Sequence, residues 1–441
     1  MTSPSPWTES RPPRRVVAEE EFKPLLASQA HDLLMLANGF LELTPEQWTQ
    51  RQLYHLSQAS TDLETYLDDY GAKENRQFFK CRELIAILRW SSAAMSGLVH
   101  LHARIGSYQI VQSDWINNNL DPLVRTSALE LGDAISRCLK TLRSFWKESG
   151  MVWPDAALRV ESLGAAGPSY RLMRDRDEQR PEALHTSQAA RLVGRFIHLA
   201  SQFDANKPYR VEDHTELREI MDRFCREEQC RRIESQIHNL QSVYDSEIAG
   251  CAEEGNHPAL RKLRGAASIS LHLFEAATAL SHLYGRHKMD SFLDSEGKVI
   301  LGEIEIGKIV INTCSICAYN VLNETVAVAD ELLKELTEVE SKTLEIPEGV
   351  SLHARPISLI VSVVNQHRTP VEAEIEGDKC SAASIMQLLV MAGGHPNVKA
   401  IRFTGDRRSL RDLELLFAAS LGEDGFDKIP KELSYLVPSV G

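Results

Sequence analysis

Apolar side chains recur at intervals of three and four residues through most of the chain between residues 18 and 340. This spacing is typical of amphipathic helices, because it places the apolar residues on one face. In the first part of the chain it predicts a helix that stops near Asn38-Gly39, followed by helices at about 45–70, 74–105 and 123–147. Since the predicted connections are mostly short, we expect these four helices to form an antiparallel bundle over 18–149.

A second helical unit repeats part of this pattern. The residues Leu98, His100, Leu101 and Arg104 recur 182 positions later as Leu280, His282, Leu283 and Arg286, and Arg82 and Arg264 keep the same offset. We interpret this as a duplicated helical unit, 18–149 and 184–340. The competing interpretation is a chance match between two amphipathic helices. Between the units, 150–183 is rich in Pro, Gly and charged residues, which predicts a linker or long loop.

From residue 342 the spacing changes to that of strands and short helices. It predicts strands at 343–346, 371–376, 379–381 and 398–404 and helices at 355–366, 385–391 and 409–420. The order βαββαβα is that of an α+β open-faced sandwich, here over 342–424, with a C-terminal tail at 425–441. We therefore predict a multidomain protein in which an all-α helical bundle region is followed by this α+β domain.

Composition and charge narrow the class of protein. A net charge of −13 over 441 residues argues against a general nucleic-acid binder, which needs a broad cationic surface. Residues 1–17 are rich in Pro and Ser without an apolar core, which predicts a disordered tail rather than a secretory signal. No apolar run approaches the ~18–20 residues of a membrane span. Eight scattered cysteines suit reduced thiols in a cytoplasm.

One histidine near the end of the chain comes directly before a predicted helix start. His353 precedes Ala-Arg-Pro at 354–356, and proline is favoured in the first helical turn, where its missing N–H costs nothing. His353 is therefore expected at a helix N-terminus, facing free backbone N–H groups and the positive end of the helix dipole. Such a place stabilises a phosphoryl group. Because a neutral imidazole is a good nucleophile, the arrangement suggests a phosphohistidine.

Two motifs here resemble HPr, the small histidine phosphocarrier of the bacterial sugar phosphotransferase system. They are Leu352-His-Ala-Arg-Pro356 and Ala383-Ser-Ile-Met-Gln-Leu-Leu389, at the separation found in that family. The resemblance covers 342–424, under a fifth of the chain. It implies that His353 accepts the phosphoryl group, that Arg355 helps to stabilise the phosphate, and that the partners are phosphoryl donor and acceptor proteins of a phosphotransferase system.

The second motif implies two further roles. Ser384 matches the serine that a regulatory kinase phosphorylates in many bacteria, so a serine kinase is a further expected partner. From the residues alone, Ser384 is placed to N-cap the helix that follows, and the two roles are compatible. The resemblance also implies a partner-binding surface that consists of Ile385, Met386, Leu389 and Ile357.

The sequence departs from HPr at two places. Ser351 stands where the family usually has glycine, so the loop before His353 is expected to have a different shape. The helix after His353 lacks the lysines of HPr and is unusually apolar, with Ile357, Leu359, Ile360, Val361, Val363 and Val364. Since exposed apolar patches usually mark an interface, we hypothesise that this helix docks on the helical region or on a dedicated partner.

Other candidate chemistry is weaker. His100, His272, Glu275, His282 and His287 have residue types and spacings that could bind a metal between helices, although such histidines are far more often core or interface residues. Cys314-Ser-Ile-Cys317 is a CxxC inside a predicted helix without a second pair, which favours buried thiols. We expect no metal and no cofactor.

The leading functional hypothesis is an HPr-family carrier or regulator that accepts a phosphoryl group on His353 and relays or signals it, rather than an independent enzyme. One alternative is a regulatory interaction protein that no longer shuttles phosphate and is controlled through Ser384. Another is a helical signalling scaffold on which the HPr-like module serves for docking. The sequence pattern indicates no specific role for the helical region.

Overall fold

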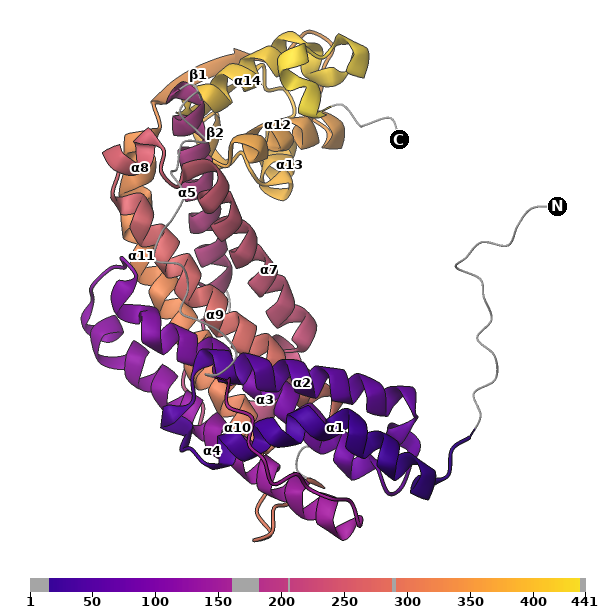
Figure 1. Ribbon diagram of the computed structural model, residues 1–441. Coiled ribbons are helices and arrows are strands. Elements are labelled where there is room, and N and C mark those ends of the chain that lie inside the picture. The colour runs from indigo at the N-terminus through magenta and orange to yellow at the C-terminus, as the bar shows by residue number, and fades with distance from the viewer. Residues whose placement is uncertain (1–15, 161–181, 205–206, 288–290, 437–441) are drawn as a thin grey trace, which may run out of the picture.

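The computed structural model describes residues 16–160, 182–204, 207–287 and 291–436. Most of the predicted N-terminal tail and most of the predicted linker lie outside these residues. The described chain is a long helical region that carries a small α+β domain at one end (Figure 1). The predicted fold class, an all-α region followed by an α+β domain, is confirmed.

The first helical unit contains the four long helices that the apolar spacing predicts. They are α1 (Glu19–Leu41), α2 (Gln50–Asp69), α3 (Phe79–Arg104) and α4 (Asp121–Glu148). Thr49 starts α2 as its N-cap, because its side chain accepts a hydrogen bond from the backbone N–H of Gln52. After α4 the chain turns back along α1, where the N–H of Leu158 donates to the carbonyl of Met35 at 2.9 Å. The start of the predicted linker is therefore packed on the first unit.

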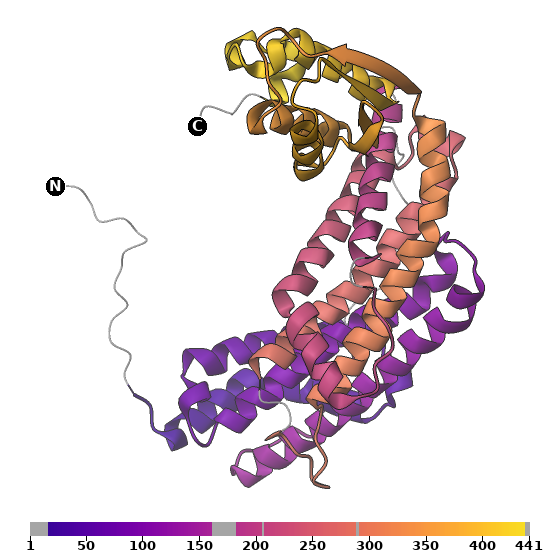
Figure 2. The same ribbon diagram turned by 180° about the vertical axis from the view of Figure 1, so that it is seen from behind.

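The second helical unit has more and shorter helices than the first. Its helices are α5 (Glu182–Asp204), α6 (His214–Phe224), α7 (Glu227–Val243), α8 (Ala252–Asn256), α9 (Ala259–Arg286), α10 (Glu303–Lys308) and α11 (Ile316–Leu336), with a π-helical turn, Ile309–Ser315, before α11. The long helices α5, α7, α9 and α11 pack together as α1 to α4 do in the first unit. Figure 2 shows them rising from the first unit toward the α+β domain.

One ion pair occurs at equivalent places in both units. The guanidinium of Arg82 in α3 donates two hydrogen bonds to the carboxylate of Asp68, at 2.8 and 2.9 Å. Arg264 in α9 does the same to Asp245, at 2.8 and 2.9 Å. Asp68 lies in the last turn of α2, and Asp245 follows α7, so the two bidentate pairs join corresponding helices. The two arginines were among the sequence matches on which the duplication was inferred, whereas their partners Asp68 and Asp245 were not, so the carboxylates add new support.

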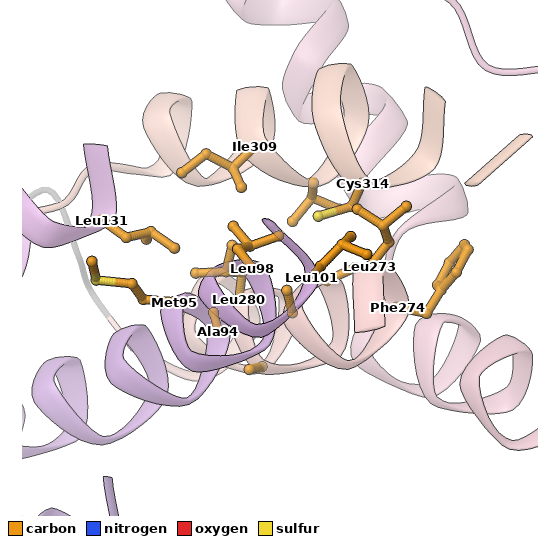
Figure 3. Packing of buried hydrophobic residues seen from close by; sticks show 14 of the residues in the cluster. Ala94, Met95, Leu98, Leu101, Leu131, Leu273, Phe274, Leu280, Ile309 and Cys314 are labelled. Carbon is orange, nitrogen blue, oxygen red and sulfur yellow. The ribbon is translucent and has the colours of Figure 1, made fainter. Parts of the chain in front are cut away.

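The two units meet where α3 crosses α9. Trp90 of α3 stacks on His282 with ring centroids 4.0 Å apart, and His100 of α3 meets His272 at 4.6 Å. With the offset of 182, each of these contacts is the other one with the two helices exchanged. Figure 3 shows the apolar residues beside the crossing, with Leu98 and Leu280 near its centre. One continuous core therefore runs through both units.

The apolar stretch of α3 bears on the question of a membrane span. Phe79–Ser107 is long and apolar enough to cross a membrane by length and composition, with a mean hydropathy of 1.4 over its best stretch. The expectation that no such stretch exists was therefore too strict. In this structure 61% of that stretch is buried, because α3 packs against α2, α4 and α9. A central core helix of a large helical protein has the same composition.

The α+β domain follows α11 after only two residues. Its elements are β1 (Val339–Glu345), α12 (Ala354–His367), β2 (Val371–Ile375), β3 (Asp378–Ser381), α13 (Ile385–Gly394), β4 (Ala400–Asp406) and α14 (Arg407–Ala418). The order βαββαβα is the predicted one, and the antiparallel sheet has the strand order β1-β4-β2-β3. Strand β1 begins at Val339, earlier than predicted, because it pairs along its whole length with β4, from Val339 opposite Asp406 to Glu345 opposite Ala400.

The domain extends beyond its predicted end at residue 424. The C-terminal segment, defined here as residues 420–436, forms three short 3-10 turns, Ser420–Gly422, Phe426–Lys428 and Lys431–Leu436. Its residues Leu421, Ile429, Leu433 and Leu436 are buried in the core of the domain. The predicted C-terminal tail is therefore part of the domain as far as Leu436. This segment contacts α12 and α14.

Candidate functional site

His353 is the N-cap residue of α12. Its Nδ1 accepts a hydrogen bond from the backbone N–H of Arg355 at 3.4 Å, and its side chain is 53% exposed. This contact requires Nδ1 to be unprotonated, so the neutral ring carries its proton on Nε2. The hydrogen bond is long and therefore weak, so an electrophile can displace it from the Nδ1 lone pair. The prediction that the first helical turn would place His353 at the helix N-terminus is confirmed.

A carboxylate that the sequence did not indicate lies on the other side of the ring. Oε1 of Glu423 is 3.6 Å from Nε2 of His353. Glu423 reaches this place because the backbone turns sharply just before it, where Ser420, Leu421 and Gly422 all have positive φ. Its negative charge favours the proton on Nε2 and thus the free lone pair on Nδ1. The two ring nitrogens therefore have different surroundings.

The guanidinium of Arg355 does not contact His353 in this structure. Its Nη2 donates to the carbonyl oxygen of Gly422 at 3.0 Å, and the group lies over the ring of Phe426 at 5.2 Å from the centroid. Both partners belong to the C-terminal segment. The backbone N–H of Arg355 contacts the imidazole of His353, whereas the Arg355 guanidinium is held by the C-terminal segment. A phosphate at His353 would have to draw the side chain from these partners.

The apolar helix after His353 is covered by its own domain. All six apolar residues singled out in the sequence are buried in the domain core, against α13, α14 and the C-terminal segment. Leu359, for example, lies directly beside Gly422. The inference that this helix needs the helical region or a partner to cover it is therefore wrong. Ile357 is 1% exposed, so it contributes no side-chain surface to a partner.

The short helix α13 presents an apolar surface. Met386 and Ile385 are 71% and 44% exposed, and Leu389 is half-buried. Val390, which the sequence analysis did not name, is 69% exposed. Its position one turn after Met386 was the available signal, because residues four apart share a helix face. Ser384 is the N-cap of this helix, and its Oγ accepts from the N–H of Gln387 at 3.3 Å, as predicted.

Ser384→Ala is expected to destabilise the α+β domain by about 1 kcal/mol, because the first turn of α13 loses its side-chain cap. Urea unfolding followed by the signal of this domain measures the change. Ser384→Asp serves as the matched control, since aspartate is an equally good cap and adds a charge at the helix N-terminus. An equal loss in both variants would contradict a capping role.

The histidines of the helical region have separate partners. Nδ1 of His100 is 2.9 Å from Oε1 of Gln50, and Nδ1 of His282 is 3.0 Å from Oε2 of Glu227. Burial lowers the pKa of both imidazoles. Within the described parts of the chain, no three His, Cys, Asp or Glu side chains are grouped so that they could hold a metal ion. These histidines therefore act as contacts between helices here.

The CxxC cysteines also have a structural environment. Cys314 and Cys317 are fully buried free thiols in the π-helical turn and the start of α11. Burial raises the pKa of Cys314 well above its usual value and that of Cys317 to about 12. Both thiols stay protonated at neutral pH, which removes the thiolate that redox chemistry or zinc binding requires.

Comparison with known protein families gives a match for the α+β domain. Residues 340–409 match the family model described as the PTS HPr component phosphorylation site. No curated protein and no solved structure matches the chain. The matched residues run from β1 into α14 and include His353, Arg355 and Ser384. Together with the βαββαβα fold, the match shows that this chain carries an HPr-like domain of the phosphotransferase system at its C-terminus, fused to a helical region.

Proposed function

We propose that His353 accepts a phosphoryl group from a phosphotransferase-system protein in the cytoplasm and relays it, or signals its presence to the helical region. The observation that carries this proposal is the place of the His353 ring. It lies inside the matched residues, at a helix N-terminus, with Nδ1 facing a backbone N–H group. Phosphoryl transfer requires positioning and charge compensation more than covalent machinery, and this place supplies both.

In the proposed step, Nδ1 attacks the phosphorus atom of the donor. A P–N bond forms at Nδ1 while the bond from phosphorus to the leaving atom of the donor breaks, and the proton on Nε2 stays in place. Glu423 then acts as a positioning residue, because its carboxylate holds the Nε2–H tautomer. The backbone N–H groups at the start of α12 are left beside the phosphoryl oxygens, where the helix dipole stabilises their charge.

Ser384 supports a second role for the same domain. It precedes the exposed Ile385 and Met386, and its own side chain is half-buried at the N-terminus of α13. A phosphate on Ser384 would add about two negative charges beside this apolar surface and would be stabilised by the helix dipole. We propose that a serine kinase regulates partner binding in this way, whether or not His353 carries phosphate.

The test of the carrier uses the full chain, labelled phosphoenolpyruvate and the first enzyme of a phosphotransferase system. We expect label that is stable in base and labile in acid, as a phosphohistidine is, and that maps to the peptide containing His353. A chain that takes up no such label from any cognate donor, while Ser384 is labelled by a kinase, would leave only the regulatory role.

We also propose that the HPr-like domain works while docked on the helical region. The backbone of α5 at Gly194 lies against the loop after α12, and a Cβ at Gly194 would fall 1.7 Å from the carbonyl oxygen of Arg368. Nearby, Nη2 of Arg408 donates to the carbonyl of Leu336 at 3.1 Å. These contacts leave His353 and α13 at a different part of the domain. In this arrangement, the phosphorylation state of His353 would be signalled to the helical region through the loop after α12.

Gly194→Leu is expected to release the HPr-like domain, because the new side chain must occupy the space of the Arg368 carbonyl. Small-angle scattering should then show a larger radius of gyration, and hydrogen exchange should rise around Arg368. Gly285→Leu is the control, since Gly285 is also helical and nothing lies within 4 Å of its Cβ position. If the scattering of Gly194→Leu equals that of the control, the docked arrangement does not persist in solution.

This proposal assigns no membrane span to the chain. The helix that meets the length and apolarity of a span is α3, and its apolar residues contact α2, α4 and α9. Withdrawing α3 into a lipid bilayer would expose the core of both helical units. A form in which α3 spans a bilayer would therefore require the helical region to unfold.

A further inference from the structure

A large cavity lies in the second helical unit. Its volume is about 720 Å³, and its walls come from the end of α5, the segment after it, α6, α7, α9 and the π-helical turn before α11. Pockets that bind small molecules typically have volumes of roughly 300–1,000 Å³. The phosphoryl-transfer proposal uses none of these residues. The cavity is therefore a separate feature of the helical region.

In the first helical unit, large side chains fill the position that corresponds to the cavity. An alignment of α2 with α7 identifies them. Thr49 and Arg226 are the N-cap residues of α2 and α7, and each backbone N–H donates to the side chain of a glutamine three residues later, Gln52 or Gln229. These equivalent caps align α2 with α7 at an offset of 177. The paired ions Asp68 and Asp245, at the other ends of these helices, have the same offset.

This alignment identifies the residues whose loss opens the cavity. The counterpart of Trp48 is Cys225, and that of Leu53 is Cys230. In the first unit, Trp48 is 3% exposed, packs on Phe40 with ring centroids 4.9 Å apart, and donates to the Phe40 carbonyl. In the second unit, both cysteines line the cavity instead. Two large apolar side chains are thus replaced by small ones at the same wall.

A second difference keeps the cavity open. In the first unit, the segment that contains Leu158 crosses α1 at Gly39, where a Cβ would come within 2.8 Å of the Leu158 carbonyl oxygen. The space left there is about 250 Å³. The sequence Leu36-Ala-Asn-Gly-Phe40 in α1 matches Leu199-Ala-Ser-Gln-Phe203 in α5, so the counterpart of Gly39 is Gln202. A side chain at this position would occupy the space of such a crossing segment. Gln202 lines the larger cavity.

The lining indicates the chemistry of an occupant. Among the described residues, the wall contains two cationic side chains, Lys207 and Arg232, and no aspartate or glutamate, although the chain as a whole has a net charge of −13. Aromatic side chains supply flat apolar surface: Phe203, Tyr209, Phe224 and Phe274. Burial raises the pKa of Cys225 to about 12 and that of Cys230 to about 11, so both thiols are neutral.

We infer that the second helical unit binds a small organic anion in this cavity, with a flat apolar body against Phe203 and Phe274 and an acidic group at Lys207 and Arg232. A mostly apolar wall with a few convergent charges is the usual composition of a small-molecule site. The absence of carboxylates from the described wall removes the repulsion that an anion would meet elsewhere on this acidic chain. The helical region would then be a ligand-binding unit attached to the HPr-like domain.

The test measures binding of two fluorescent probes to the full chain. Anilinonaphthalene sulfonate is a flat aromatic anion, and phenylnaphthylamine is its uncharged analogue. We expect one anionic probe per chain, bound more tightly than the neutral one. The double variant Lys207→Gln, Arg232→Gln should weaken anion binding about tenfold or more and leave the neutral probe unaffected, because only the charge of the wall changes.

Filling the cavity separates this site from nonspecific probe binding. Cys225→Trp restores the residue of the first unit and should abolish binding of both probes, while Cys225→Ser should bind as the natural chain does. Cys230→Leu is a second filling variant, in case the tryptophan disturbs folding, and circular dichroism checks the helix content of each. Anion binding that survives both filling variants, or that is unchanged in the double charge variant, would overturn the inference.

Discussion

Replacing His353 by alanine is expected to abolish acid-labile phosphate labelling of the full chain. The reason is geometric, because His353 has its ring nitrogen at the N-terminus of α12 within the residues that match the phosphorylation-site family. No other group at this helix end can form the P–N bond. The measurement is label retained after gel separation, with and without acid treatment.

The control for this prediction is another histidine of the same domain. His395 contacts Asp378 at 2.8 Å and Glu376 at 3.2 Å, and hydrogen bonds from His395 to these carboxylates raise the pKa of its imidazole. Both nitrogens are thus engaged, so His395→Ala should label like the natural chain. If His353→Ala keeps its label while His395→Ala loses it, the assignment of the acceptor is wrong.

A Glu423→Gln variant tests whether Glu423 positions the His353 ring without being required for phosphoryl transfer to it. The amide can still contact Nε2 of His353 but no longer supplies a negative charge. Labelling should therefore persist at a lower rate, and nitrogen NMR of the imidazole should show less of the Nε2–H tautomer. Glu423→Asp, which keeps the charge, should recover part of both signals. An unchanged tautomer population would mean that Glu423 does not orient the ring.

In the HPr-like domain, the sequence predicted the helices and strands correctly wherever neighbouring residues determine them. Proline at position 356 in the first turn and the N-cap residues His353 and Ser384 set the helix starts, and the strands alternate in polarity. Element boundaries were less accurate where a partner sets them. Strand β1 begins at Val339 because Asp406 lies opposite it, and nothing in the local sequence of β1 specifies that pairing.

The C-terminal segment could not be recognised from local pattern. Its 3-10 turns have neither the helical nor the strand period, so Leu421, Ile429 and Leu433 looked like isolated apolar residues in a tail. The excess of apolar residues on α12 was the signal, and it was assigned to the wrong partner. Because the C-terminal segment was not recognised, the sequence did not indicate Glu423 as a neighbour of His353. Glu423 reaches His353 only because this segment folds back over α12.

In the helical region, the sequence matches aligned α3 with α9 but did not indicate which contacts recur in space. Arg82 and Arg264 were aligned by their offset of 182, whereas their carboxylate partners, Asp68 in α2 and Asp245 just after α7, have a different offset. Insertions between helices change the offset, so only contacts in space reveal the equivalence. The replacement of Trp48 by Cys225 is invisible without that alignment.

Arg82→Met is expected to destabilise the helical region by about 3 kcal/mol, because it removes the shared cationic partner of two buried carboxylates. Glu64 keeps Arg89 at 3.0 Å, and Glu83 keeps His287, so the compensation is reduced rather than lost. The Arg82 guanidinium contacts Glu64 at 3.0 Å, Glu83 at 2.9 Å and Asp68 at 2.8 Å. Glu64 and Glu83 are each 4% exposed, so neither charge can be solvated when Arg82 is removed. Glu83 also contacts Nδ1 of His287 at 2.8 Å, which joins the two helical units.

The matched control is the corresponding ion pair of the second unit. Arg264 pairs with Asp245 in the same bidentate geometry, but the Asp245 side chain is 49% exposed. Water can replace the lost partner there, so Arg264→Met should cost only about 0–1 kcal/mol. Urea unfolding monitored by circular dichroism measures both changes. Equal losses in the two variants would show that burial does not set the cost.

The pH dependence gives an independent check on Arg82. Burial raises the pKa of Glu83, but hydrogen bonds and charges from His287 and Arg82 outweigh it and lower that pKa below the usual value. A carboxyl group of this kind stabilises the fold above its unfolded pKa of roughly 4.3, and the stability is lost as the pH falls through the lower folded value. In Arg82→Met, the buried Glu83 carboxylate loses one of the partners that lower its pKa. The folded-state pKa of Glu83 therefore rises, and stability should begin to fall at a higher pH. An acid-unfolding midpoint that does not rise relative to the natural chain would contradict this assignment.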